Sequence, residues 1–463
     1  MKYVTYAILV FLTIGCEKTN ENAATYFGGQ IINPKTNYVL FLKDEKVIDT
    51  LLLDKDNRFL KEITLTKGGL YTFKHGTEFQ YIYLEPSDSV LVRLNTWDFD
   101  QSLVFSGKGS AKNEFLINLY LQNEKEERMM YLNFDLNEQA FQAKIDSLSK
   151  ERIAVYNDFF ANEVAVSKGF EEFTNTAIQF PLYRLKEVYP YYHKGVYNLE
   201  EFPEVSDTFY DFRKSISLNE EQLVTFYPYQ NYVVSYLYNI SFQLKENDST
   251  KNDLTVNILN AVNQHIKAEQ FKNILLKRIL VSDFLKSGSA CRVNEEALSI
   301  FLANCTNEED IEQVNNLVKD CNNIQLEQPI QDFDIISYSN VPLTINKVIK
   351  NKNAVIYFWS TDYISTDYLV NRIKFLEKRY PELMFIGINM QTLPRDLSKE
   401  SNLKLLNFHN QYMLSKDSYA HNYLSSKYPR TILIDNSGIV KNGFANLDSK
   451  NLDSELNKLI SGK

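Results

Sequence analysis

The sequence predicts a multidomain α+β protein with a small N-terminal β-sandwich, a central α-helical domain and a C-terminal α/β domain. The first observation is the length of 463 residues, which exceeds that of one ordinary domain. The second is a change along the chain from short strands separated by turns to helical periodicity. The third is the return of buried strands, alternating with helices, near the C-terminus. A hydrophobic content of 44% and a charged content of 24% are typical of a soluble globular chain.

The N-terminus predicts an exported protein. Lys2 precedes the apolar stretch Ala7–Ile14, which is too short to span a membrane, so residues 1–15 are interpreted as a secretory signal peptide. The small residue before Cys16 resembles the cleavage box of bacterial lipoproteins, which implies that Cys16 is lipidated and that residues 16–24 form a tether. The expected location is a membrane of a Gram-negative cell envelope, on the periplasmic face or at the cell surface. The alternative is an ordinary signal peptide, with Cys16 an incidental thiol.

Residues 25–109 have the pattern of a small β-sandwich. Turn sequences such as Asp54–Asn57 and Glu85–Asp88 separate six apolar segments. The predicted strands are Tyr38–Leu42, Val47–Leu53, Phe59–Leu65, Tyr71–Lys74, Tyr81–Leu84 and Val90–Leu94. This region contains one histidine, His75, and no acidic pair that suggests an active site.

Residues 110–326 are predicted to be helical, because apolar side chains recur at helical spacing, as at Ile311, Val314 and Leu317. The segment Gln325–Pro329 is expected to be the linker into the C-terminal domain. Four prolines are expected to separate the helices, namely Pro181, Pro190, Pro203 and Pro228.

Two aromatic stretches, Tyr183–Tyr192 and Phe226–Tyr238, allow two interpretations. They would line a groove for an extended peptide or glycan, or they would pack the helices together. The packing interpretation is favoured, because aromatic side chains at helical spacing are usually core residues.

Three cysteines remain after Cys16, which leaves at least one thiol unpaired within the chain. The residues are Cys291, Cys305 and Cys321, and none has Cys-x-x-Cys spacing. They are expected to be buried inert thiols, or to include one Cys305–Cys321 bridge.

The C-terminal residues 327–463 have the pattern of an α/β domain. The apolar run Ala354–Trp359 suits a strand that is buried on both faces, and Leu383–Met390 suits a second one. An amphipathic helix is predicted between them and another over Leu452–Ile460. A strand–turn–strand hairpin is predicted over residues 428–440.

These residues resemble the TlpA/ResA-type thiol-disulfide oxidoreductases, whose domain has the thioredoxin-like fold. In that family a strand ending in Phe-Trp leads to a Cys-x-x-Cys motif at a helix start, and the cysteine positions fall here on Tyr363 and Thr366. Neither side chain can supply a redox thiolate. The resemblance also implies that Pro429 is the family's cis-proline, which faces the motif. Tyr83–Val90 and Phe105–Gly109 resemble the β-domain often fused ahead of such domains.

Other chemistries find little support in the sequence. Thr366 or Ser365 suits a helix cap, with Asp367 in the first turn, and no base is placed beside them for nucleophilic catalysis. The five histidines form no i, i+4 pair, so no metal site and no cofactor are expected. A net charge of −9 argues against nucleic acid as a partner.

The first hypothesis is therefore a redox-inactive, membrane-anchored protein that binds a protein or peptide partner. Its predicted groove is formed by Trp359, Asp362, Tyr363, Pro429 and Arg430, with the arginine meeting an acidic group of the partner. The second is a thiol-disulfide oxidoreductase that uses the cysteines outside the motif. The third is a structural or solute-binding component that acts through the helical domain.

Overall fold

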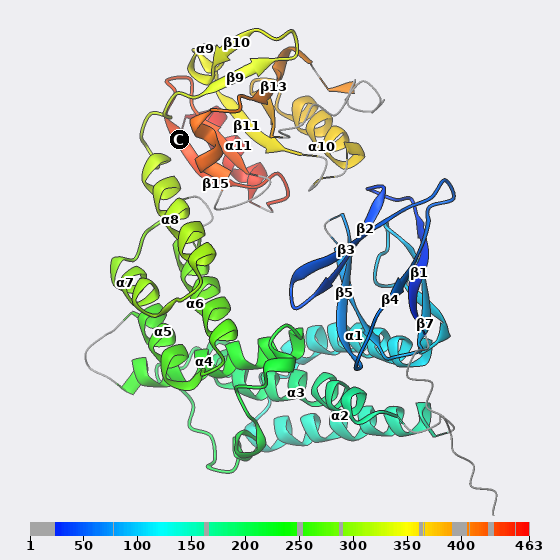
Figure 1. Ribbon diagram of the computed structural model, residues 1–463. Helices are drawn as coiled ribbons and strands as arrows, with labels where there is room; N and C mark the ends of the chain where they lie inside the picture. The colour runs from blue at the N-terminus through cyan, green and yellow to red at the C-terminus, as the bar shows by residue number, and fades with distance from the viewer. Residues whose placement is uncertain are drawn as a thin grey trace, which may run out of the picture.

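A computed structural model describes most of the chain downstream of the N-terminal segment. The described residues are 24–76, 78–161, 166–247, 253–286, 290–360, 364, 366–390, 405–406, 408–424, 430–449 and 451–462. They form an N-terminal β-domain, a central set of helices and a C-terminal α/β domain (Figure 1). The predicted fold class is confirmed.

The N-terminal β-domain consists of two four-stranded sheets, ordered β4-β1-β7-β8 and β3-β2-β5-β6. Their inner faces enclose an apolar core in which Phe27, Phe73 and Val90 are fully buried. The prediction did not single out β1, which pairs with both β4 and β7, or β8. The strands are β1 (Thr25–Ile32), β2 (Tyr38–Lys43), β3 (Lys46–Leu52), β4 (Arg58–Ile63), β5 (Gly69–His75), β6 (Glu78–Leu84), β7 (Ser89–Asn95) and β8 (Val104–Lys108).

The central domain is helical, as predicted, but two of the four prolines do not separate helices. Pro181 and Pro190 lie inside α3, whereas Pro203 falls in the connection before α4 and Pro228 in the first turn of α4. Each proline inside α3 lacks the N–H that would donate a backbone hydrogen bond. The burial of α3 against α4 and its other neighbours outweighs this loss. The helices are α1 (Ser110–Met130), α2 (Glu138–Phe159), α3 (Lys168–Tyr197), α4 (Tyr227–Asn247), α5 (Leu254–His265), α6 (Glu269–Phe284), α7 (Glu295–Asn304) and α8 (Glu308–Asn323). Short 3₁₀ helices are η1 (Tyr131–Asn133), η2 (Asp211–Ser215) and η3 (Glu221–Leu223).

The aromatic side chains of this domain pack the helices together, which confirms the favoured interpretation. Tyr189, Tyr229 and Tyr232 are almost wholly buried. The rings of Phe180 and Tyr232 meet edge to face, with 5.2 Å between centroids, across the α3–α4 contact.

The C-terminal domain contains a seven-stranded sheet in the order β10-β9-β13-β12-β11-β14-β15. β11 pairs in parallel with β12 and antiparallel with β14, and β12 pairs in parallel with β13. This arrangement is the thioredoxin-like fold that the sequence predicts. The elements are β9 (Asp334–Ser337), β10 (Pro342–Thr344), α9 (Ile345–Ile349), β11 (Ala354–Trp359), α10 (Thr366–Arg379), β12 (Met384–Asn389), η6 (Phe408–Asn410), β13 (Gln411–Leu414), η7 (Tyr419–Leu424), β14 (Thr431–Ile434), β15 (Val440–Ala445) and α11 (Leu452–Ser461).

Both faces of this sheet are buried, so β11 is apolar at every position. One face packs against α10 and α11, through residues such as Leu369 and Leu456. The other face packs against α9 and Ile324, which follows α8.

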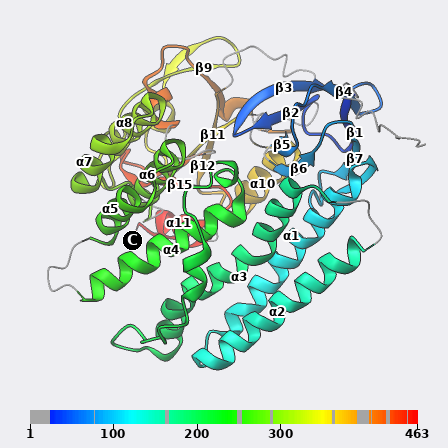
Figure 2. The same ribbon diagram turned by 60° about the horizontal axis from the view of Figure 1, so that its bottom comes forward.

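The β-domain and the helices are joined through one common apolar core. Leu70 and Tyr83 of the β-domain belong to the apolar cluster of the helices. The Asn113 side chain of α1 accepts a hydrogen bond from the Tyr83 amide at 2.6 Å and donates one to the Tyr83 carbonyl at 2.9 Å. Figures 1 and 2 show α1 lying along the base of the β-domain.

The segment predicted as a linker is part of the C-terminal domain's structure. The Glu327 amide donates to the Val440 carbonyl, and the Val440 amide donates to the Gln328 carbonyl, each at 2.9 Å. The Ile330 amide bonds to the Gly438 carbonyl in the same way. These bonds extend the sheet beside β15, so α8 continues directly into the C-terminal domain (Figure 1).

Candidate functional site

The candidate site lies where β11 ends and α10 begins. Trp359 is the last residue of β11 and Thr366 is the first residue of α10. The sequence places the family's cysteine positions in this connection. Of the predicted site residues, Asp362, Tyr363, Pro429 and Cys16 lie outside the described residues.

Trp359 does not line an open groove, contrary to the prediction. Its side chain is 2% exposed and packs in the cluster that contains Ile364 and Leu369. The Met390 amide donates to its carbonyl at 3.0 Å, which fixes the end of β11 beside β12. Burying the large apolar surface of an indole stabilises the folded protein. Trp359 is therefore a core residue next to the candidate site and does not present a contact surface.

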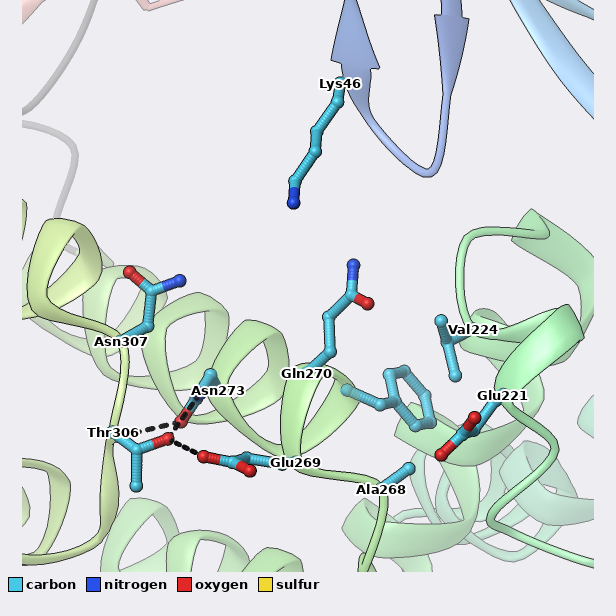
Figure 3. Close-up of a pocket in the computed structure, with 10 residues that line it drawn as sticks. Lys46, Glu221, Val224, Ala268, Glu269, Gln270, Asn273, Thr306 and Asn307 are labelled. Atoms are coloured by element: carbon cyan, nitrogen blue, oxygen red, sulfur yellow. Dashed lines mark hydrogen bonds between the residues drawn. The ribbon is translucent and has the colours of Figure 1, made fainter.

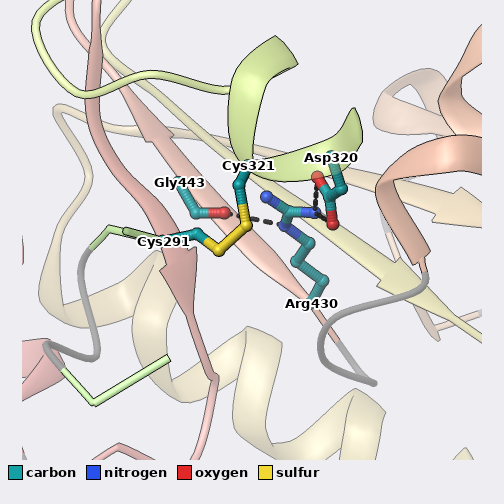
Figure 4. The surroundings of a disulfide bond; sticks show 5 residues. All are labelled: Cys291, Asp320, Cys321, Arg430 and Gly443. Atoms are coloured by element: carbon teal, nitrogen blue, oxygen red, sulfur yellow. Dashed lines mark hydrogen bonds and ion pairs between the residues drawn. A yellow bond between two sulfur atoms is a disulfide. The ribbon is translucent and has the colours of Figure 1, made fainter. Parts of the chain in front are cut away.

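Arg430 is also buried, so its predicted contact with a partner's acidic group is wrong. One guanidinium nitrogen, Nη1, lies 2.6 Å from both carboxylate oxygens of Asp320 in α8 (Figure 4). Nε donates to the Gly443 carbonyl at 2.7 Å, and the guanidinium lies 4.0 Å from the centroid of the Phe444 ring. Both charged side chains are fully buried. The acid that Arg430 meets is supplied by the helical domain of the same chain.

This ion pair places the helical domain against the candidate site. The Phe358 amide donates to the Arg430 carbonyl at 2.9 Å, next to the end of β11. Nothing in the sequence around Asp320 distinguishes it from the exposed acids of α8. Its role depends on a contact across 110 residues, which periodicity does not reveal.

The disulfide joins Cys291 to Cys321, directly after Asp320 (Figure 4). The predicted Cys305–Cys321 bridge is therefore wrong. The Cα atoms of the bonded pair lie 5.0 Å apart, which is within the usual range. Cys305 remains a free thiol at the end of α7, and burial raises its pKa. A buried thiol with a raised pKa is a poor nucleophile.

The histidines of the described residues have structural partners. His75 is fully buried, and its Nε2 accepts a hydrogen bond from the Lys35 amide at 2.8 Å. His421 Nε2 lies 3.0 Å from the Ser415 carbonyl. Within the described part of the chain, no three histidine, cysteine or acidic side chains are grouped as metal ligands. In the same part, no helix is both long enough and apolar enough to cross a bilayer.

A second candidate is a polar cavity of about 510 Å³ between the β-domain and the helices (Figure 3). Lys46 reaches toward it from the start of β3, and Gln270 faces it from the first turn of α6. Polar side chains that line the cavity bond to one another. Thr306 Oγ1 donates to Glu269 at 2.6 Å, and the Thr306 amide donates to the Asn273 side chain at 3.0 Å. The cavity is the place where a polar solute would fit under the third hypothesis.

Comparisons with known proteins give only distant structural similarity. No family model and no curated protein matches the chain. A putative thiol-disulfide oxidoreductase from Bacteroides vulgatus is 19% identical, with a TM-score of 0.26, over 29% of this chain and 97% of that protein. A thioredoxin-like protein from Bacteroides caccae is 12% identical, with a TM-score of 0.28, over 45% and 83%. A putative thiol:disulfide interchange protein DsbE from Chlorobium tepidum is 13% identical, with a TM-score of 0.25, over 30% and 99%.

These values are too low to transfer an activity. The thioredoxin-like fold of the C-terminal domain rests on its own strand order and pairing.

Proposed function

We propose that this protein is a cell-envelope lipoprotein whose thioredoxin-like domain is redox-inactive and binds a protein or peptide partner. Lipidation at Cys16 would anchor it to a membrane. The observation that carries the proposal is the residue at the head of α10. Thr366 stands there in place of a thiol, and the chain's cysteines other than Cys16 lie in the helical region, before β9.

A thioredoxin-like domain without thiols keeps the features that suit recognition. The start of α10 offers backbone N–H groups and the positive end of a helix dipole. Trp359 is buried at the end of β11, and the Arg430–Asp320 pair joins the residue before β14 to α8. A preorganised backbone lowers the entropic cost of binding an extended segment.

The experiment is site-specific photo-crosslinking in cells, with the probe at Tyr363 and the products identified by mass spectrometry. We expect one dominant partner, which is lost when Pro429 is replaced by alanine. A matched control places the same probe at Leu132, which is 81% exposed on the helical domain. Diffuse crosslinks from Tyr363, or a pattern equal to that of the control, would contradict the proposal.

The position of the Cys291–Cys321 bridge favours a second candidate, a thiol-disulfide oxidoreductase that works through this bridge. Cys291 is only half-buried, whereas Cys321 is buried and adjoins the ion pair at the candidate site. The reaction requires that a thiolate of the reductant attacks Cys291 and that Cys321 leaves as a thiolate. Rapid alkylation of Cys321 after mild reduction at neutral pH would support this candidate. Alkylation only after unfolding would exclude it.

A further inference from the structure

The exposed face of α10 carries an aromatic and cationic stripe. Tyr368, Arg372, Phe375 and Arg379 follow one another at spacings of four, three and four residues, which places them along one side of the helix. The opposite side supplies the buried residues of the domain core. Tyr368 is 41% exposed and Phe375 is 48% exposed, although burying such rings is favourable.

The two arginines of this stripe are held in place around Phe375. Their guanidinium carbons lie 5.7 Å (Arg372) and 5.8 Å (Arg379) from the ring centroid. Arg372 Nε donates to the Leu447 carbonyl at 2.9 Å, and Arg379 pairs with Asp453 at 3.3 Å. These contacts with the segment around α11 occupy only some of the five N–H donors of each guanidinium. The arrangement is preorganised to accept carboxylates beside an aromatic ring.

Lys374 and Lys378 add two exposed cations one turn apart, on the side of α10 next to the stripe. Neither lysine forms a salt bridge in the part of the chain that the structure describes, although Lys374 interacts electrostatically with Glu377. α10 carries four cations against two acids, Asp367 and Glu377, and Asp453 of α11 adds a third acid beside Arg379, so one positive charge remains in excess in a chain whose net charge is −9. Such a local excess of positive charge attracts an acidic ligand.

We propose that this face of α10 binds an acidic polypeptide segment of the partner, with an apolar or aromatic side chain against Phe375 and carboxylates against the flanking cations. The inference rests on the proposed function, because it names the chemistry of the partner. A protein segment fits better than a membrane surface, because the patch holds only two half-exposed rings and two of its cations already have fixed contacts. Arginine and aromatic residues are also the usual centres of protein–protein binding energy.

The test is fluorescence anisotropy with the mature full-length protein and a labelled peptide in which glutamates flank a central phenylalanine. We expect salt-dependent binding that Lys374→Glu/Lys378→Glu weakens by about tenfold or more, and Phe375→Ala by about tenfold. The matched control is Lys350→Glu/Lys352→Glu, which reverses two exposed charges elsewhere in the same domain and leaves binding within about twofold. Circular dichroism confirms that each variant is folded.

Three results would overturn the inference. The first is failure of the peptide to bind, the second is equal binding of a peptide with glutamine in place of glutamate, and the third is an equal loss in the control variant. Binding of phosphatidylserine vesicles that depends on Lys374 and Lys378, without peptide binding, would assign the face to a membrane instead. If the partner still crosslinks at Tyr363 in the Lys374→Glu/Lys378→Glu variant, this inference fails while the proposed function stands. If no partner crosslinks in the unaltered protein, the proposed function itself fails.

Discussion

At the scale of single residues, buried polar groups determine how the domains of this protein are joined. Arg430 and Asp320 are both fully buried, and each compensates the other's lost hydration. His75 is fully buried in the β-domain as a hydrogen-bonded neutral base. Such groups make a structure specific, because removing one partner leaves the other without compensation.

Replacing Asp320 by asparagine is expected to destabilise the C-terminal domain by about 3–5 kcal/mol, because the Arg430 charge stays buried without its counter-ion. The measurement is urea unfolding followed by the fluorescence of the buried Trp359, in a Trp97→Phe background that removes the chain's other tryptophan. The double variant Asp320→Leu/Arg430→Met is expected to recover part of the loss, since it removes both charges. The exposed Asp211–Lys214 pair provides the control, where Asp211→Asn costs about 0.5 kcal/mol or less. A similar cost at both sites would contradict the role given to Asp320.

His75 is expected to make the stability of the β-domain depend on pH. Burial lowers the pKa of its imidazole below the ordinary value of 6.5, and Nε2 must be unprotonated to accept from the Lys35 amide. The unfolded chain therefore binds a proton at higher pH than the folded chain does, so the contribution is present above about 6.5 and is lost as the pH falls below it. Unfolding free energies measured across this range should fall less steeply in His75→Gln than in the unaltered protein. Equal slopes would show that another group controls the acid sensitivity.

At the scale of elements, the disulfide and the segment after α8 unite the helical and C-terminal domains. The Cys291–Cys321 bond closes a loop that contains α7 and most of α8, and the residues after α8 extend the sheet beside β15. The C-terminal end of α8 is therefore restrained by a covalent bond, an ion pair and backbone hydrogen bonds.

Removing the bridge with Cys291→Ser/Cys321→Ser is expected to cost about 3–4 kcal/mol, the loop entropy for a sequence separation of 30 residues. Hydrogen exchange should accelerate most in α7 and α8, because these helices lie within the closed loop. The control is Cys305→Ser, which alters a buried thiol that has no bridge. Unchanged exchange in α7 and α8 would show that packing alone holds this region.

At the scale of the whole molecule, each of the three parts shares buried contacts with the next one along the chain. The β-domain shares a core with the helices, and the residue after α8 packs in the core of the C-terminal domain (Figure 1). The strand order and pairing of that domain follow the thioredoxin-like fold, and Thr366 is the first residue of α10.

Introducing a Cys-x-x-Cys motif with Tyr363→Cys/Thr366→Cys is therefore expected to create insulin-reducing activity in the presence of dithiothreitol, and we expect the unaltered mature protein to show none. A thiol near the start of α10 gains thiolate character from the helix N-terminus. Thr366→Cys alone is the control, because a single thiol cannot resolve a mixed disulfide. Robust turnover by the unaltered protein would refute the redox-inactive assignment.

The sequence by itself determined the three-part architecture and the absence of a cysteine from residues 360–366. Those properties depend on local periodicity and residue identity, which a single strand such as Ala354–Trp359 already displays. Only the tertiary structure decided that Trp359 and Arg430 are buried, that Cys321 bonds to Cys291, and that Pro181 lies inside a helix. The physical reason is that burial, ion pairing and disulfide choice depend on which distant segments meet, and those contacts leave no periodic trace along the chain.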